Sequence, residues 1–99
     1  MRNIKDLLNE STNNSIPVNV ILNGSGSMHG DKEMKDAINA VLKQFTHANL
    51  FVYNTSDDEV VELNGMNEFK PAGPHNNKLK GLDKFFMDHI GQTNIFMTN

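Results

Sequence analysis

Apolar residues in this chain form either short continuous runs or series spaced three and four residues apart. The short runs, rich in β-branched and aromatic residues, predict strands over 18–22, 50–53, 59–63 and 93–98. Most of these runs are followed by Asn, Gly, Ser or Asp, residues that favour turns. The first run is almost uninterrupted, which is typical of a strand buried on both faces of a parallel sheet.

Two segments between these strands have the period of amphipathic helices. Asp31 occupies an N-cap position, and apolar residues over 34–45 then recur at helical spacing. A second segment begins at about Lys78 and ends before Gly91, a residue typical of helix C-caps. Residues 1–16 predict a short amphipathic helix followed by a polar linker.

The order of these elements predicts one α/β domain over 17–99. Right-handed crossovers arrange the strands as a mostly parallel sheet of order 3-2-1-4, with helices on both faces in a three-layer, Rossmann-like layout. The third strand is antiparallel because only the short turn 54–58 separates it from the second. Ligands of such sheets bind beyond the carboxyl ends of the strands, here at the loops after Leu22, Phe69 and Met97.

Composition restricts the functions that this fold can carry. The 99 residues include no Cys, which excludes disulfides and zinc–cysteine sites and favours a cytoplasmic location. We expect no signal peptide, no membrane-spanning segment and no His-based zinc site. A net charge of −3 without a basic cluster argues against a nucleic-acid partner. The 15 Asn are an unusual excess, and the composition resembles that of small bacterial and phage proteins.

The loop after the first strand, Asn23-Gly24-Ser25-Gly26-Ser27, carries the strongest chemical signal. Its Gly-rich backbone could cradle a phosphate group or nucleotide. Alternatively, the hydroxyls of Ser25 and Ser27 could ligate a hard cation such as Mg²⁺. A tight turn without a ligand explains the same pattern. The loop is neither a P-loop nor a nucleophile elbow, and no base is assigned to either serine, so we expect no enzyme activity.

The run VNVILNGSGSM resembles the first strand and metal loop of von Willebrand factor A-type (vWA) domains, whose loop reads Asp-x-Ser-x-Ser. The later elements over 17–99 follow the order of the first half of that fold. The resemblance implies a protein-interaction module with a metal-ion-dependent adhesion site (MIDAS). In that site Ser25 and Ser27 would be ligands of Mg²⁺ or Ca²⁺.

Three departures from the family motif predict a degenerate MIDAS. Asn23 stands where the family has its first Asp, and His75 or Asn76 stands where it has a Thr. Thr98 and Asn99 stand where it has Thr-Asp. Two carboxylates are thus replaced by neutral amides, and hydroxyl and amide oxygens alone bind Mg²⁺ weakly. We expect a module that binds a partner protein, with weak Mg²⁺ or Ca²⁺ binding or none; a phosphate or nucleotide ligand is the alternative.

Two further acidic positions have structural interpretations. Asp31 could reach into the metal loop, although capping the following helix is the simpler role. The acidic residues over 57–59 form a solvated hairpin tip, because they lack the ligand spacing of a calcium loop.

The fourth strand is expected to have an unpaired edge, because a full vWA domain continues with further strands. Unpaired edges are templates for another chain. We therefore expect an antiparallel homodimer through this edge, with the N-terminal helix folded over the edge as the alternative.

Overall fold

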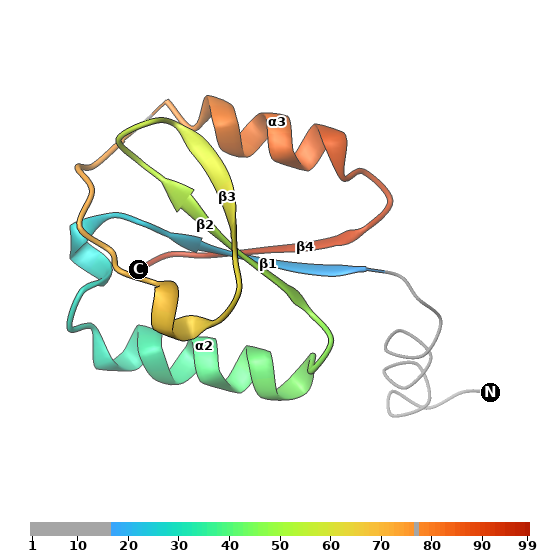
Figure 1. The fold of residues 1–99 in the computed structure, drawn as a ribbon, viewed down its shortest axis with the longest axis horizontal. Helices are drawn as coiled ribbons and strands as arrows, with labels where there is room; N and C mark the ends of the chain where they lie inside the picture. Colours follow the sequence, from blue (N-terminus) through green and yellow to red (C-terminus); the bar gives the residue numbers. More distant parts are fainter. Residues whose placement is uncertain (1–16, 77) are drawn as a thin grey trace.

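A computed structural model describes residues 17–76 and 78–99, which form a four-stranded mixed sheet between two helices (Figure 1). In chain order the elements are β1 (Val18–Asn23), α2 (Lys32–Gln44), β2 (Asn49–Asn54), β3 (Glu59–Leu63), α3 (Lys80–Asp88) and β4 (Thr93–Met97). Short 3-10 helices lie at Gly26–Met28 and Met66–Glu68. The helix and linker predicted over 1–16 lie outside the described residues. No helix in the described part of the chain has the length and apolarity needed to cross a membrane.

The strand order is β3-β2-β1-β4, and this confirms the predicted α/β topology. β1 pairs in parallel with β2 and with β4, while β2 and β3 form the antiparallel hairpin. β1 is central, and five of its six residues are buried, as its continuous apolar run predicts. The carboxyl ends of β1, β2 and β4 meet at one end of the sheet, and β3 and β4 are its two edges.

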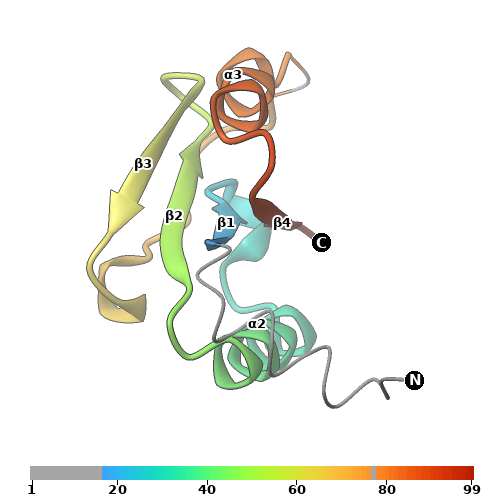
Figure 2. The ribbon, with the colours of Figure 1, turned by 90° about the vertical axis from the view of Figure 1, so that its right-hand side faces the viewer.

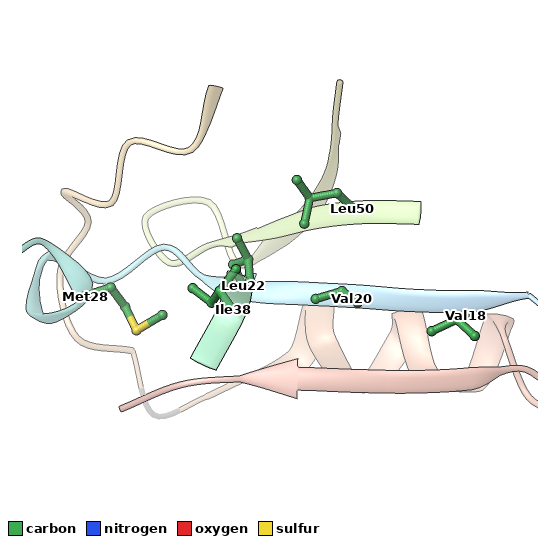
Figure 3. Packing of buried hydrophobic residues seen from close by; sticks show 6 residues of the cluster. All are labelled: Val18, Val20, Leu22, Met28, Ile38 and Leu50. Atoms are coloured by element: carbon green, nitrogen blue, oxygen red, sulfur yellow. The ribbon is translucent and has the colours of Figure 1, made fainter. Parts of the chain in front are cut away.

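The two helices cover opposite faces of the sheet (Figure 2). Alternate residues of β1 point to the α2 face, because successive side chains of a strand point to opposite faces. There they meet side chains from α2, β2 and the loop after β1 (Figure 3). The buried members of this cluster are Val18, Val20, Leu22, Met28, Ile38 and Leu50.

The opposite face packs against α3. Ile21 of β1 and Tyr53 of β2 meet Leu82 and Phe85 of the helix. Phe51 lies edge-to-face against Phe85, with ring centroids 4.8 Å apart. These contacts explain the apolar spacing along α3, whose buried residues lie three apart.

The hairpin turn after β2 determines where α3 begins. Leu79 has a left-handed φ of 53°, so the helix starts at Lys80, two residues after the predicted start. Asp58 accepts hydrogen bonds from the Gly81 N–H (2.8 Å) and from the Tyr53 hydroxyl (2.5 Å). A Cβ on residue 81 would lie 2.0 Å from the Asp58 carbonyl oxygen, so this close approach requires glycine.

These contacts correct the expectation of a solvated acidic tip, because Asp58 fastens α3 to the sheet. The hydrogen bond from Tyr53, followed by that from Gly81, holds the pKa of the Asp58 carboxyl below its usual range. Burial, with a further contribution from Asp58, raises the pKa of the Tyr53 hydroxyl to about 12.

Amide side chains cross the sheet near the amino ends of its strands. Asn19, only 1% exposed, donates from Nδ2 to Gln92 Oε1 (2.7 Å) and to Asn94 Oδ1 (2.8 Å). Its Oδ1 accepts from Asn49 Nδ2 (3.2 Å). Asn94 in turn donates to the carbonyl of His89, the C-cap residue of α3 (3.1 Å). We call Asn19, Asn49, Gln92 and Asn94 the amide ladder; it satisfies the buried Asn19 and joins β1 to both neighbouring strands.

Candidate functional site at the carboxyl ends of the strands

The loop after β1 is held by backbone hydrogen bonds to two neighbouring segments. The Gly24 N–H donates to the Tyr53 carbonyl (2.9 Å), and the Gly26 N–H donates to the Gly73 carbonyl (2.9 Å). A Cβ on residue 24 would lie 2.6 Å from the Tyr53 carbonyl oxygen, so the close approach to β2 requires glycine. Ser25, which forms an isolated β-bridge with Gly73, is 5% exposed.

The two serines of this loop turn their hydroxyl groups toward each other. Ser25 Oγ and Ser27 Oγ lie 3.2 Å apart. Ser25 Oγ also accepts from the Ser27 N–H (3.4 Å), which caps the 3-10 helix that follows. The hydroxyls therefore converge on one point, while Ser27 remains exposed to solvent.

The Asn99 side chain lies beside the two serine hydroxyls and bonds to both Ser27 and Asp31. Its Oδ1 accepts from Ser27 Oγ (3.1 Å), and its Nδ2 donates to the Ser27 carbonyl (2.6 Å) and to Asp31 Oδ2 (3.1 Å). Asp31 Oδ1 accepts from the Met34 N–H (3.0 Å), so Asp31 caps α2 and also reaches the loop. The hydrogen bonds from Met34 and Asn99 hold the pKa of the Asp31 carboxyl below its usual range.

Asn23 connects the same loop to the end of β4. Its Nδ2 donates to Thr98 Oγ1 (2.9 Å), and its Oδ1 accepts from the Ser25 N–H (3.3 Å). The side chains from β1, its loop and the segment after β4 thus form one connected network. We call this network the Asn–Ser cluster; its members are Asn23, Ser25, Ser27, Asp31, Thr98 and Asn99.

The residues expected at the family's threonine position lie in the segment before α3. Asn76 Nδ2 donates to the Thr55 carbonyl beyond the end of β2 (2.9 Å), and His75 is exposed. The hydrogen bonds between this segment and the serine loop come instead from Ala72 and Gly73, whose N–H groups donate to the Gly24 carbonyl. Small residues permit that contact, and the Ala-Gly pair is the sequence signal that could have indicated it.

The backbone of the loop is already hydrogen-bonded. From Gly24 to His29, six consecutive N–H groups each donate to an acceptor within the protein. The six acceptor groups belong to five residues of the loop and its neighbours, namely Asn23, Ser25, Gly26, Tyr53 and Gly73. A phosphate cradle needs such N–H groups for the ligand. A phosphate would therefore have to displace internal hydrogen bonds, which disfavours the phosphate interpretation.

The oxygen atoms of the Asn–Ser cluster suit a hydrogen-bonded network better than a divalent ion. They belong to three hydroxyls, two amides and one carboxylate, that of Asp31, which already accepts two hydrogen bonds. Among the described residues, no three His, Cys, Asp or Glu side chains are grouped so as to hold a metal. Mg²⁺ gives up its water reluctantly and prefers carboxylate oxygens, so this nearly neutral donor set does not fit a strong site.

A groove of about 850 Å³ begins beside the cluster and runs between α2 and the segment after β3. Asp31 belongs to both the groove and the cluster. Lys32 and Lys35 lie on one side of the groove, while Met66 and Phe69 supply apolar surface on the other. The exposed end of the sheet thus continues into a surface with both apolar and charged groups.

No protein-family model, curated protein or solved structure matches this chain.

Proposed function

We propose that this chain is a small, noncatalytic protein-interaction module of vWA type with a degenerate metal site. Its partner binds at the carboxyl ends of β1 and β4. The observation that carries the proposal is the position of the Asn99 amide, which donates to Asp31 and to Ser27. A carboxylate could not donate these bonds. An amide therefore closes the cluster, where a carboxylate would supply charge for a cation.

Two features of the Asn–Ser cluster support this interpretation: its hydroxyls keep the arrangement of metal ligands, and its amides lack the negative charge of carboxylates. The hydroxyls of Ser25 and Ser27 converge as metal ligands would, yet the nearby amides of Asn23 and Asn99 are neutral. Such a site keeps a defined polar surface without an ion. The adjoining groove adds apolar surface, and a polar surface beside apolar surface is typical of protein-binding sites.

The metal independence of the site is tested by restoring charge. We expect that neither Mg²⁺ nor Ca²⁺ shifts the melting temperature of the wild-type chain. The Asn23→Asp, Asn99→Asp double variant should melt at a higher temperature with Ca²⁺ or Mg²⁺ than without, because binding stabilises the folded state. The matched control is Asn64→Asp with Asn67→Asp, two exposed positions outside the cluster. A cation-dependent shift in the wild type would contradict the degenerate site.

Partner binding is tested by affinity capture from cell lysate with the immobilised full chain. We expect one or more captured proteins whose yield does not change with chelator and falls with Ser27→Lys. Ser56→Lys, an exposed serine in the hairpin turn, is the control and should leave capture unchanged. Capture that requires divalent cations would instead support a working MIDAS. Stabilisation of the chain by nucleotides in a melting scan would support the ligand-binding alternative.

A further inference from the structure

The two edges of the sheet differ in charge. β3 carries Glu59 and Glu62, both exposed, and charged side chains are a common protection of edge strands. β4 has the sequence TNIFM, without a charge or a proline. Within the described residues β4 pairs with β1 alone, and no other strand of this part of the chain covers its outer edge.

The register of β4 identifies which backbone groups face outward. The Thr93 N–H donates to the Pro17 carbonyl (3.0 Å), so residue 93 is oriented toward β1. Backbone groups of successive strand residues point to alternate sides. Asn94 and Phe96 therefore present their N–H and C=O groups at the free edge, and Thr98 continues this series just beyond the strand.

Charged and apolar residues on the flanks of α2 and α3 also lie beside the two edge strands. Lys84 and Asp88 of α3 line a pocket with Glu59 of β3, so helical periodicity places Phe86 on the flank toward β4. On α2, Lys32 and Lys35 line the groove beside the segment after β3, and the same periodicity turns Val41 toward β4. Both flanks nevertheless mix residue types. The β3 side also holds the apolar Met66 and Phe69 of the groove, and helical periodicity places Asp83 beside Phe86 on the β4 side.

We infer that the β4 edge binds β4 of a second copy of this chain, antiparallel and centred on Phe96. This inference rests on the proposed interaction function and names one partner for it. In this register Phe96 faces Phe96 of the second copy, and Ile95 faces Met97 of the second copy, so apolar residues meet apolar residues. Asn94 faces Thr98 of the second copy, which pairs polar residues. The strand is self-complementary, and no like charges oppose each other across the symmetry axis.

A neighbouring register is less favourable for the same strand. If Ile95 lay at the centre, Phe96 would face the polar Asn94 of the second copy, and Met97 would face Thr93. The Phe96-centred pairing therefore makes a specific prediction about which residues are adjacent. It extends the sheet to eight strands and covers the half-buried Ile95, Phe96 and Met97.

The first measurement is the mass of the full chain in solution by light scattering and sedimentation over a concentration series. We expect a concentration-dependent species of twice 11.1 kDa. Met97→Lys places a charge opposite Ile95 of the second copy and should weaken the dimer about tenfold. Val61→Lys, an exposed apolar position (43%) on β3, is the matched control and should not weaken it.

Cross-linking tests the register, because the natural chain has no Cys. Ile95→Cys and Met97→Cys chains should form a disulfide when mixed, and neither should do so efficiently alone. Val61→Cys mixed with either one should remain uncross-linked. Circular dichroism and melting curves show whether each variant is folded before it is mixed.

A monomer at every concentration would overturn the second-copy inference and leave partner binding at the loops untouched. A monomer with slow amide exchange at Asn94 and Phe96 would overturn it as well, and would assign the edge to residues 1–16 of the same chain. A dimer that is not weakened by Met97→Lys and does not cross-link in the mixture would place the contact elsewhere and overturn the β4 pairing.

Discussion

Two networks rich in asparagine connect β1 to β4, one at each end of the sheet. At the amino ends, the amide ladder surrounds Asn19, which is 1% exposed. At the carboxyl ends, the Asn–Ser cluster joins Asn23 to Thr98 and Ser27 to Asn99, largely in contact with solvent. The side-chain chemistry is similar, but the surroundings differ. Because it surrounds a buried side chain, the first network stabilises the fold. Because it is exposed, the second network is accessible to a binding partner.

Each network also holds one end of a helix. The amide ladder reaches the last turn of α3 through the bond from Asn94 to the His89 carbonyl. The Asn–Ser cluster reaches the first turn of α2 through Asp31. The start of α3 is fastened separately by Asp58, which lies beyond the carboxyl end of β2. Each helix packs on the apolar core along one face only. Polar side chains at the helix ends therefore help to fix its position.

The largest expected effect is at the buried network. Asn19→Leu should lower the free energy of unfolding by about 2–3 kcal/mol, because the buried Asn19 side chain makes three hydrogen bonds that are all lost. Urea unfolding followed by circular dichroism measures this change. Asn39→Leu, on the exposed side of α2, is the control and should stay within about 0.5 kcal/mol of wild type. Equal costs for both variants would show that the ladder does not stabilise the fold.

An intermediate effect is expected at the anchor of α3. Tyr53→Phe should cost about 1–1.5 kcal/mol, because the buried hydroxyl and Asp58 lose their hydrogen bond. Urea unfolding of both chains measures the difference. As a control, Phe51→Tyr added to the Tyr53→Phe chain places a hydroxyl on a neighbouring ring. It does not restore the hydrogen bond to Asp58 and should not recover the lost stability. A cost below the error of the extrapolation would contradict the anchor.

The same anchor predicts the pH dependence of stability. The pKa of Asp58 is lowered in the folded state, so its contribution is present above the unfolded value near 3.8 and is lost as the pH falls through the folded pKa. The pKa of Tyr53 is raised, so its contribution is present below pH 10 and is lost as the pH rises toward about 12. Unfolding curves across both ranges should show these losses in wild type and smaller acid losses in Asp58→Asn. Identical acid profiles would refute the role of Asp58.

The smallest expected effect is at the exposed network. Asn99→Ala should change stability by less than about 0.5 kcal/mol, as is usual for an exposed side chain. It should nevertheless raise the pKa of Asp31 toward its ordinary value, since a donor to that carboxylate is lost. An NMR titration of Asp31 in both chains measures the shift, with Asn67→Ala as the control. An unchanged pKa would mean that Asn99 does not bond to Asp31 in solution.

Elements with a strong local pattern could be predicted from the sequence. The apolar run of β1, the hairpin, the Asp31 cap and the spacing of α2 are local features, and the strand order followed from right-handed crossovers. The convergence of Ser25 and Ser27 likewise depends on one short loop. These features needed no knowledge of distant contacts.

Features that depend on distant contacts could not be predicted. Asp58 looked like one acid in a solvated turn, because its partner Gly81 lies 23 residues further along the chain. Asn19 and Asn94 appeared as part of a compositional excess of asparagine, since only the register of the sheet brings them together. The vWA resemblance placed Asn99 at the serine loop, and Asp31 was expected to be able to reach that loop. The hydrogen bond between them, which spans 68 residues, was not predicted.

The hydrogen bond between the Gly24 N–H and the Tyr53 carbonyl has a consequence for the chemical ageing of the protein. Asn-Gly sequences deamidate when the glycine nitrogen attacks the asparagine side chain to form a succinimide. In the folded chain this nitrogen is held against β2, and the Asn23 amide is held by Thr98. Deamidation at Asn23 should therefore proceed mainly from molecules in which this loop is unfolded. The fraction of aspartate and isoaspartate at this position then records how much time the protein population has spent unfolded.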